Sequence, residues 1–589
     1  MKPENLSYYI DKYKKIKSTD NDLKKFKVAI LSSSTIKGLK EVLTVKCHDI
    51  GLSPAVLMGE YNQYNQEILD SKSELYRFDP DLVVLFIDTR ALLGDTFFDY
   101  YSLSIEDQKG LLASKKGYID SLIKNMKAKL KAKIVIHNFE VPINSPLGIL
   151  ENKNEFGIAE FIEKLNGDLR DEFKFDPQVF IFDYNSFISN IGKGEVFNYK
   201  MYYLADIKID LCYLPVLADQ YLGYIKPLLS ITKKCIVLDL DNTLWGGILG
   251  EDGIEGIKLG PTPDGRPFME FQKYLLSLLN RGVILAINSK NNLDEALEII
   301  KKHPHMILKE KHFASMKINW NDKISNMKAI AEELNIGLDS FVYFDDDKFN
   351  REMISNALPQ IKVVDLPDDP SLYLMTINEL DDFNVFQITE EDLKKPRIYE
   401  EQRKRNEFSR SIQDITAYLK SLNMRIIIEK ANKFNIPRIS QLTQKTNQFN
   451  LTTRRYLQED IEKFSNSGDF MVFSIKVEDK FGDNGITGAA IVKKEARKWI
   501  IDSFLLSCRE IGRRVEETML AYIFEEAKRE GVNRIIGEFI PTQKNAPAKD
   551  LYKKSGFVLT ENINGRELWV CDVAKGFAYP EIIEVTKAG

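Results

Sequence analysis

The stretch Leu238-Asp239-Leu240-Asp241-Asn242-Thr243-Leu244-Trp245-Gly246 decides the fold of the central part of this chain. It continues an apolar run that starts at Cys235, and it places Asp239 and Asp241 at the end of a predicted strand. Alternate side chains of a strand share one face, so we expect both carboxylates to face one site. One can attack phosphorus while the other handles a proton. An unpaired buried charge is costly, so a cation is expected beside them, and Mg²⁺ suits carboxylate ligands.

The composition is that of a multidomain globular protein. The chain has 589 residues, of which 44% are hydrophobic and 29% charged, enough for three or four domains. The net charge of -5 gives no electrostatic reason to expect nucleic-acid binding. We see no apolar run long enough for a bilayer and no signal-peptide core, so we expect no membrane association and a cytoplasmic location. The five cysteines lack the spacing of a zinc site or a disulfide framework, so a special cysteine would act as a thiol.

The order of apolar runs and amphipathic stretches predicts an α/β fold with several domains. Residues 1–228 alternate strand and helix patterns, as a doubly wound sheet does, and the pattern restarts over 229–370. Residues 371–423 are charged and helical, which suits a linker of exposed helices. Residues 424–589 form a third, α+β domain. We expect strands near residues 27–31, 82–88, 133–137, 178–183, 236–241, 283–288, 341–345, 361–365, 424–429, 470–477, 486–492, 499–506, 535–539 and 558–569.

Three further segments of the central domain complete a phosphoryl-transfer site. Ser289 ends a strand at a helix start, where its hydroxyl and the amides from Lys290 onward can hold phosphate oxygens. Lys323 opens the next helix, where an ammonium can neutralise the charge of the nucleophile and the phosphoryl group. Asp345 and Asp346 end another strand and suit a divalent cation. Each feature alone also fits a helix cap or a solvated side chain, but the ordered set favours the catalytic interpretation.

The spacing of these segments leaves no room for a cap domain. Only about one strand and one helix fit between Thr243, another expected substrate contact, and Ser289. The glycine-rich segment 244–260 can form at most a flap hairpin. An uncapped site admits a phosphoryl group that is carried on something large, such as a protein-tethered arm.

Residues 235–260 closely resemble the FkbH-like family, the haloacid dehalogenase subfamily IIIC phosphatases that build glyceryl-loaded acyl carrier proteins for polyketide biosynthesis. The resemblance is carried by Leu-Trp-Gly-Gly at 244–247 and Gly-Glu-Asp-Gly at 250–253, and it continues through residues 61–66, 137–139, 145–148, 445–454 and 541–547. It implies an SGNH-hydrolase-like N-terminal domain, a Rossmannoid haloacid-dehalogenase-like domain without a cap, and a GNAT-like acyltransferase domain. The implied reaction moves the acyl group of 1,3-bisphosphoglycerate, a small acyl phosphate, to the phosphopantetheine thiol of an acyl carrier protein and removes the remaining phosphate.

The resemblance also implies roles for the site residues. Asp239 would be the nucleophile and Asp241 the general acid and base. Mg²⁺ would be held by Asp239, Asp345 and the backbone carbonyl of Asp241, with Asp346 in the same shell. The family usually has Asp-Asp-Asn-Pro where this chain has Asp-Asp-Asp-Lys at 345–348, and without the proline the turn is less rigid.

The predicted strand 499–506 leads into Ser-Cys-Arg-Glu-Ile-Gly-Arg-Arg at 507–514, which resembles the pyrophosphate-binding turn of GNAT enzymes. Arg514 stands where a small residue is expected, which argues against ordinary acetyl-CoA binding. Arg509 and Arg514 could instead contact the single phosphate of a carrier-bound pantetheine. The neighbouring arginines would also favour the thiolate of Cys508, which makes Cys508 the candidate acyl-carrying thiol, or alternatively a small buried filler.

Two segments remain open to more than one interpretation. Lys445 and Arg454 could hold a phosphoglyceryl group, or they could belong to a solvated loop. Residues 32–34 are three serines placed as a hydrolase nucleophile would be, but the triad looks incomplete, which favours a scaffold or docking role. The rival functions for the whole chain are a stand-alone phosphatase on a small phosphorylated metabolite and a carrier-protein scaffold.

Overall fold

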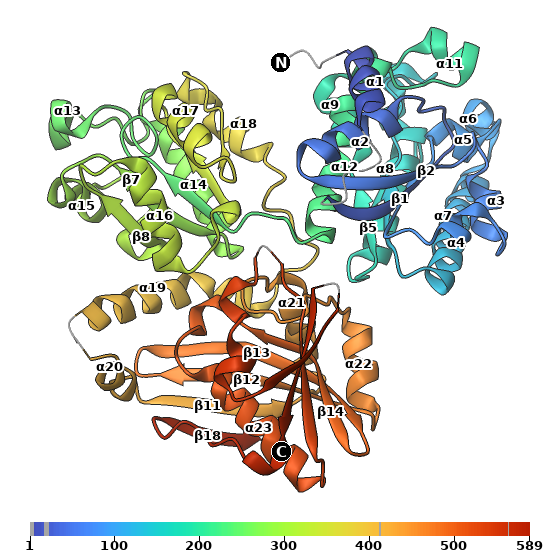
Figure 1. Cartoon of the computed structure of the whole chain (residues 1–589). Helices are drawn as coiled ribbons and strands as arrows, with labels where there is room; N and C mark the ends of the chain where they lie inside the picture. The colour runs from blue at the N-terminus through green and yellow to red at the C-terminus, as the bar shows by residue number, and fades with distance from the viewer. Residues whose placement is uncertain (1–4, 17–22, 411–413, 543, 564, 589) are drawn as a thin grey trace. The chain divides into compact units, whose positions relative to one another are not determined.

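The computed structural model describes residues 5–16, 23–410, 414–542, 544–563 and 565–588. The chain folds into two compact units, Met1–Leu229 and Ser230–Gly589 (Figure 1). Within the described residues, no helix combines the length and the apolar character that crossing a membrane requires.

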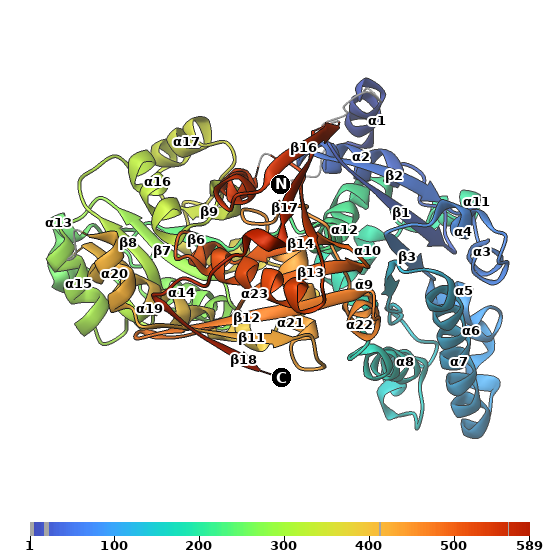
Figure 2. The ribbon, with the colours of Figure 1, turned by 60° about the horizontal axis from the view of Figure 1, so that its bottom comes forward.

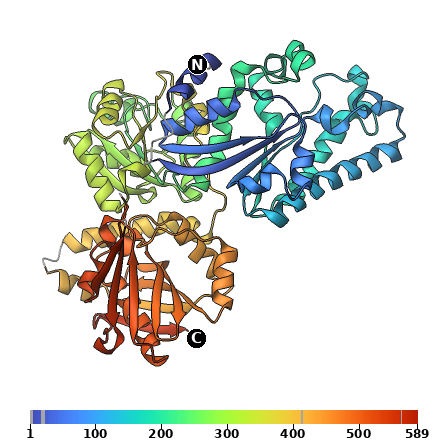
Figure 3. The same ribbon diagram turned by 45° about the vertical axis from the view of Figure 1, so that its right-hand side comes forward.

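Unit 1 is built on a parallel sheet of five strands in the order β2-β1-β3-β4-β5. Helices cover both of its faces, as Figure 3 shows around the blue strands. On one face, Ala29 and Leu31 pack with α7 and α8, while Val28 and Ile30 are buried on the other. The strands are β1 (Lys24–Ser32), β2 (Leu52–Met58), β3 (Leu82–Phe86), β4 (Lys133–His137) and β5 (Val179–Phe182).

The helices of unit 1 differ widely in length. The longest, α7, begins after Ser104, whose hydroxyl accepts the backbone N–H of Asp107 and caps the helix. The α-helices are α1 (Leu6–Lys15), α2 (Leu39–Asp49), α3 (Tyr64–Leu69), α4 (Glu74–Phe78), α5 (Thr89–Leu93), α6 (Thr96–Asp99), α7 (Ile105–Lys129), α8 (Ile158–Phe173), α9 (Tyr184–Ile191), α10 (Lys193–Val196), α11 (Tyr199–Ala205) and α12 (Leu214–Leu228).

Unit 2 begins with a second parallel sheet of five strands, in the order β10-β9-β6-β7-β8. Its central strand β6 alternates between two cores, with Ile236 and Leu238 packed among α14 residues and Val237 among α16 and α17 residues. Because β6 lies between β9 and β7, the crevice at its carboxyl end is where an open α/β sheet binds ligands. The strands are β6 (Cys235–Leu238), β7 (Ile284–Ser289), β8 (Phe313–Ile318), β9 (Phe341–Phe344) and β10 (Lys362–Val363).

The flap after β6 contains one short helix, and its two ends are joined by an antiparallel backbone bridge. Gly246 and Lys258 exchange backbone hydrogen bonds of 3.0 and 2.8 Å, and α13 lies between them with a break at Gly253, whose φ is +67°. The chain then enters α14 and β7 with no domain inserted, as the spacing predicts. The α-helices here are α13 (Leu249–Gly256), α14 (Arg266–Asn280), α15 (Leu293–Lys302), α16 (Lys323–Leu334), α17 (Lys348–Ala357) and α18 (Tyr373–Asn378).

The rest of unit 2 carries a mixed sheet of eight strands in the order β16-β17-β15-β14-β13-β12-β11-β18. Figure 2 shows α23 lying across β12, β13 and β14, where its residues Met519, Leu520 and Ile523 enter the core. The strands are β11 (Met424–Lys430), β12 (Phe470–Asp479), β13 (Gly482–Glu495), β14 (Lys498–Leu506), β15 (Arg534–Phe539), β16 (Val558–Ile563), β17 (Arg566–Asp572) and β18 (Ile583–Ala588). The α-helices are α19 (Glu390–Arg410), α20 (Ile415–Ser421), α21 (Ile436–Lys445), α22 (Gln458–Asn466), α23 (Val515–Arg529) and α24 (Leu551–Lys554).

The expectation that the charged segment is a run of exposed helices is wrong for one side of α19. Ile398, Tyr399, Glu401 and Arg405 are buried, and Arg405 pairs with Asp479 of β12. The burial of Arg405 depends on this ion pair, which composition does not reveal.

Candidate active site

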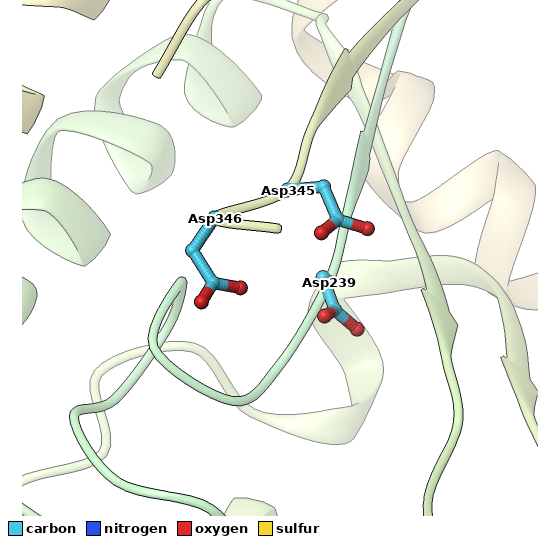
Figure 4. A group of neighbouring side chains, drawn as sticks. All are labelled: Asp239, Asp345 and Asp346. Atoms are coloured by element: carbon cyan, nitrogen blue, oxygen red, sulfur yellow. The ribbon is translucent and has the colours of Figure 1, made fainter. Parts of the chain in front are cut away.

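Three carboxylates meet at the carboxyl edge of the sheet of strands β6 to β10. Asp239 follows β6, and Asp345 and Asp346 follow the adjacent strand β9. Figure 4 shows the three side chains facing one another, and one oxygen of each lies within 4.8 Å of the others. Asp239 and Asp345 are buried and Asp346 is half-buried. The parallel register of β6 and β9 therefore creates an acidic cluster from residues more than a hundred positions apart in the sequence.

Lys323, the first residue of α16, is the cation that this cluster already contains. Its Nζ lies 3.1 Å from Asp239 and 2.5 Å from Asp345, and the residue is 1% exposed. Burial opposes the charge of Lys323, but Asp239 and Asp345 outweigh it and raise the pKa of the ammonium. Asp322 caps the helix by accepting the N–H of Ser325 at 2.8 Å, which fixes where Lys323 begins the first turn.

The carboxylates fit a divalent cation. Asp239 Oδ1 is buried and has no hydrogen-bond partner among the described residues. Burial raises the pKa of Asp239 to about 6 and of Asp346 to about 6, and the neighbouring carboxylates add to both shifts. One ammonium thus faces three crowded carboxylates, and a second positive charge would relieve their repulsion.

Asp241 is oriented differently from Asp239. Its Oδ1 accepts the indole N–H of Trp245 at 2.9 Å and the backbone N–H of Leu249 at 3.2 Å. Its Oδ2 accepts the amide of Asn291 at 2.9 Å. The side chain is not part of the carboxylate group that could hold a metal, so only its backbone carbonyl remains a candidate ligand, and the carboxyl group is held for a different role.

The other predicted substrate contacts lie around the cluster. The hydroxyl of Thr243 accepts the backbone N–H of Asp346 at 3.2 Å, which joins the β6 turn to the β9 turn. Ser289 is 1% exposed, and its hydroxyl favours the charged form of Asp239. The amide of Asn291 links Ser289 Oγ at 3.3 Å to Asp241. The side chain of Lys290 is exposed, so its backbone amide is the group that faces a phosphate in this prediction.

Four positioning residues were missed in the sequence analysis. They are Trp245, Asn291, Tyr343 and Arg351. Tyr343 donates to Asp345, and Arg351 donates to the carbonyls of Asp345 and Asp346 at 2.9 and 2.7 Å. Trp245 lies inside the quoted stretch 238–246, and Asn291 lies two residues after Ser289, so both are close in sequence to predicted site residues.

The Asp-Asp-Asp-Lys turn is ordered without a proline. Asp347 caps α17 by accepting the N–H of Phe349 at 2.9 Å, and its own N–H donates to Asp345 Oδ1 at 2.9 Å. Lys348 lies 3.9 Å from Glu352 on the helix surface. Asp347 thus caps the helix, and Lys348, at the position of the family's proline, is its first residue.

The C-terminal candidates lie in the turn after β14. Cys508 is half-buried in a 3₁₀ turn, and its carbonyl accepts the side-chain amide of Asn335. Arg509 lies 6.0 Å from the ring centroid of Tyr399. Arg514 has a φ of +64° and donates to Glu517 at 2.7 to 3.1 Å. The roles of these residues in acyl transfer and phosphate binding stay predictions.

A further segment occupies the opening between β14 and β15. Their parallel pairing stops at Ile501 and Gly537. Beyond it, Leu451 donates to Phe504 at 3.2 Å and accepts the N–H of Ile540 at 2.8 Å. The segment around Leu451 therefore lies between the chain that continues β14 and the chain that follows β15, and it is hydrogen-bonded to both.

Lys445 and Arg454 have internal partners. Arg454 binds Asp502 at 2.7 Å and Glu538 at 2.9 Å, and Lys445 lies 3.2 Å from Asp392. A phosphoglyceryl group would have to displace these carboxylates, so the geometry does not favour the predicted role, which stays a prediction.

The serines of unit 1 do not meet a histidine through any contact found in the described residues. Ser33 Oγ accepts the N–H of Asp88 at 2.8 Å. His137 is buried, and its Nε2 lies 2.9 Å from the hydroxyl of Tyr221.

The fold and the site define a domain of the haloacid dehalogenase type, with the aspartates, the serine and the lysine of that class at the carboxyl edge of one parallel sheet. The predicted multidomain α/β fold is confirmed. Residues 27–226 match the family model described as "FkbH, N-terminal domain", about a third of the chain, so the resemblance to that family is confirmed over these residues.

Solved structures resemble other parts of the chain. The N-terminal part of the protein BF1531 from Bacteroides fragilis, described as containing a phosphatase domain complexed with Mg, is 29% identical, with a TM-score of 0.60. The similarity covers 65% of this chain and 100% of that one. The ribosomal-protein-S18-alanine N-acetyltransferase of Escherichia coli is 14% identical over 25% of this chain and 94% of that one, with a TM-score of 0.21. No curated protein sequence matches the chain.

Proposed function

We propose that this chain is a magnesium-dependent phosphatase coupled to acyl transfer, which loads a glyceryl unit from 1,3-bisphosphoglycerate onto the phosphopantetheine arm of an acyl carrier protein. The observation that carries the proposal is the buried Asp239–Lys323–Asp345 arrangement at an uncapped sheet edge. The 29% identity to a phosphatase-containing protein described as complexed with Mg supports the same chemistry.

The dephosphorylation uses two aspartates in turn. Asp239 attacks the phosphorus of the phosphoglyceryl arm, and the bond from phosphorus to the glyceryl oxygen breaks. Asp241 gives its proton to the departing oxygen, and Trp245, Leu249 and Asn291 hold its carboxyl group in place. Asp241 then takes a proton from water as the water attacks the phosphoaspartate, which releases inorganic phosphate and restores Asp239.

The remaining groups stabilise charge. Lys323 is placed to neutralise the phosphoryl oxygens, and Ser289 and the following amides hold them. Asp239, Asp345 and the backbone carbonyl of Asp241 would hold Mg²⁺, with Asp346 close by, and the ion would supply Lewis-acid stabilisation of negative charge. The orphaned Oδ1 of Asp239 supports this assignment.

The acyl step is assigned to Cys508. Its thiolate attacks the acyl carbon of 1,3-bisphosphoglycerate, the bond from that carbon to the phosphate oxygen breaks, and phosphate leaves. The pantetheine thiol then attacks the resulting thioester and releases Cys508, with the thiol proton passing to the departing sulfur. The half-buried position of Cys508 beside Arg509 supports a reactive thiol.

The absence of an inserted cap supports a protein-tethered substrate. Between Thr243 and Ser289, the last residue of β7, the only helices are α13 and α14 and the only strand is β7. A small metabolite would be poorly enclosed there, whereas an extended arm can reach the buried Asp239 from outside.

Mass spectrometry of the carrier arm tests the proposal. The wild-type protein, a phosphopantetheinylated carrier, Mg²⁺ and 1,3-bisphosphoglycerate should give an arm that gains glyceryl. The Asp239→Asn variant should give an arm that gains phosphoglyceryl, because loading continues while dephosphorylation stops. The Cys508→Ala variant should leave the arm unloaded.

Other results would redirect the proposal. An acetyl or amino-acyl gain would change the donor, and an unmodified arm with every donor would contradict the transfer. If small phosphate esters are hydrolysed with a kcat/KM equal to that of the loaded carrier, the stand-alone phosphatase becomes the better description.

A further inference from the structure

Unit 1 contains a cavity of about 260 Å³ at the carboxyl edge of its parallel sheet. Its wall comes from the residues after β3, the residues after β4 and the segment around α11. In the strand order β2-β1-β3-β4-β5, the direction of winding changes between β1 and β3, and ligands of open α/β sheets bind near such a point. The cavity is lined by residues that follow β3 and β4, so it lies at the carboxyl edge of the sheet, beside that point.

The floor of the cavity is a buried ion cluster. Lys208 contacts both Asp88 and Glu140, and these residues are 7%, 2% and 6% exposed. Thr89 donates to Glu140 Oε2 at 2.7 Å, and Asp88 Oδ1 accepts the N–H of Arg90 at 2.7 Å. The positive charge of Lys208 is thus neutralised by two carboxylates. The three paired side chains hold the floor of the cavity in place.

Arg90 also lines the cavity, but its partners differ from those of Lys208. Its guanidinium lies over the rings of Phe97, Phe98 and Tyr202, at 5.3, 4.9 and 5.4 Å from their centroids. In the part of the chain that the structure describes, no carboxylate lies at ion-pair distance from it. A planar guanidinium held by aromatic rings presents a rigid row of donors that matches a carboxylate or a phosphate.

The walls around Arg90 suit an apolar group. Phe97, Phe197 and Tyr202 line the cavity, and Ile143 stands at it with 52% of its surface exposed. The aromatic faces do not serve an incoming cation, because Arg90 lies over three rings and Lys208 lies 4.8 Å from the ring centroid of Phe197.

We propose that this cavity is a binding site for a small organic oxyanion, whose carboxylate or phosphate pairs with Arg90 and whose apolar part lies on the aromatic wall. The site binds and does not react. Ser33 is 4% exposed and is not one of the residues that line the cavity, so it does not reach a bound ligand. Lys208 is held by two carboxylates, so it is not available as a base. The site consists of unit 1 residues alone, and its failure would leave the proposed phosphatase reaction untouched.

Calorimetric titration of the full-length protein with three probes tests the proposal. Benzoate and phenyl phosphate carry the two possible anionic groups, and benzylamine carries a cation on the same ring. We expect at least one anion to bind and benzylamine to bind at least tenfold more weakly. The stronger of the two anions identifies the head group.

Two pairs of variants locate the site. Arg90→Gln should weaken anion binding at least tenfold, whereas Arg170→Gln, on the exposed surface of α8, removes the same charge from the same unit and should leave it unchanged. Ile143→Glu should weaken binding by repulsion and Ile143→Lys should not, and because Ile143 is exposed both should fold. Circular dichroism checks the fold of each variant.

Several results would overturn the proposal. They are no binding of either anion at 10 mM, equal or tighter binding of benzylamine, unchanged binding in Arg90→Gln, or equal effects of the two Ile143 substitutions.

Discussion

At the scale of single residues, the chemistry depends on how Asp239 differs from Asp241. Both follow the same strand, yet Asp239 faces Lys323 with one free buried oxygen, and Asp241 has partners on both oxygens. The first arrangement suits a nucleophile beside a cation and the second suits a proton carrier whose orientation is fixed.

The Asp239→Asn substitution should abolish phosphatase activity. An amide cannot form the phosphoaspartate, so kcat on p-nitrophenyl phosphate should fall at least about 10³-fold. The matched control is Asp264→Asn, whose carboxylate is 69% exposed and lies outside the site. If both variants retain comparable activity, Asp239 is not the nucleophile.

His137 should make the stability of unit 1 depend on pH. Burial lowers the pKa of His137 to about 3, against about 6.5 in the unfolded chain. The stability that neutral His137 contributes is therefore fully present above pH 6.5. It is lost as the pH falls toward 3, because the unfolded chain binds the proton at a higher pH than the folded chain does. Between pH 7 and pH 5 the loss from this residue is about 2 kcal/mol.

Urea unfolding at several pH values measures this effect. His137→Phe should reduce the slope of the unfolding free energy against pH by the amount that corresponds to at most one bound proton, whatever its effect on the absolute stability. The control His48→Gln, a half-buried histidine of α2, should keep the steep slope. An unchanged slope in His137→Phe would show that another group carries the pH dependence.

At the scale of elements, α19 is joined to the eight-stranded sheet by buried charges. Arg405 donates to Asp479 at 2.7 and 3.1 Å and to Asn484 at 2.8 Å, and Arg513 lies 2.5 Å from both Asp479 and Glu510. The network links a helix, the end of β12 and the turn after β14.

The Arg405→Met substitution should destabilise unit 2 by about 3 kcal/mol, because it removes one partner of a buried ion pair and leaves Asn484 without its donor. The same substitution at Lys404, which is 53% exposed on α19, should change stability by less than about 0.5 kcal/mol. Thermal unfolding compares the two, and equal effects would contradict a structural role for the network.

The sequence predicted most strands because a buried parallel strand is a short apolar run with turn signals at its ends. It did not predict β2, which contains Pro54 and a mixed burial pattern, or β8, which lies at a sheet edge and carries Lys317. It also did not predict β18, an edge strand whose residues after Ile583 are half-buried or exposed. Residues 558–569 were expected as one stretch and form parts of two strands, β16 and β17, that pair as a hairpin.

The sequence predicted the site residues that follow strands and missed those that act across the fold. Asp239, Ser289, Lys323 and Asp345 occur at recognisable ends of elements. The contact of Lys208 with Asp88 and Glu140 joins three distant segments, and no local pattern indicates it.

At the scale of the whole molecule, the chain has two compact units, each with its own sheets and cores. The acidic cluster belongs to unit 2, and His137 belongs to unit 1. Ligand binding stabilises only the unit that contains the site, so Mg²⁺ and acid should affect different parts of the unfolding profile.

Differential scanning calorimetry should therefore resolve two transitions. Mg²⁺ at tenfold its dissociation constant should stabilise one of them by about 1.4 kcal/mol, and this shift should be absent in Asp345→Asn. Lowering the pH from 7 to 5 should move the other transition more. A single transition that responds to both treatments as a whole would contradict two independently folding units.

The central claim is that the carboxylate of Asp239 carries the phosphoryl group during turnover. Acid quench of the working enzyme, borohydride reduction and peptide mass spectrometry measure this directly, since reduction of a phosphoaspartate leaves homoserine at that position. Homoserine is expected at position 239 in the presence of substrate and Mg²⁺, and none when substrate is omitted. Homoserine at another aspartate, or none at all while phosphate is still released, would contradict it.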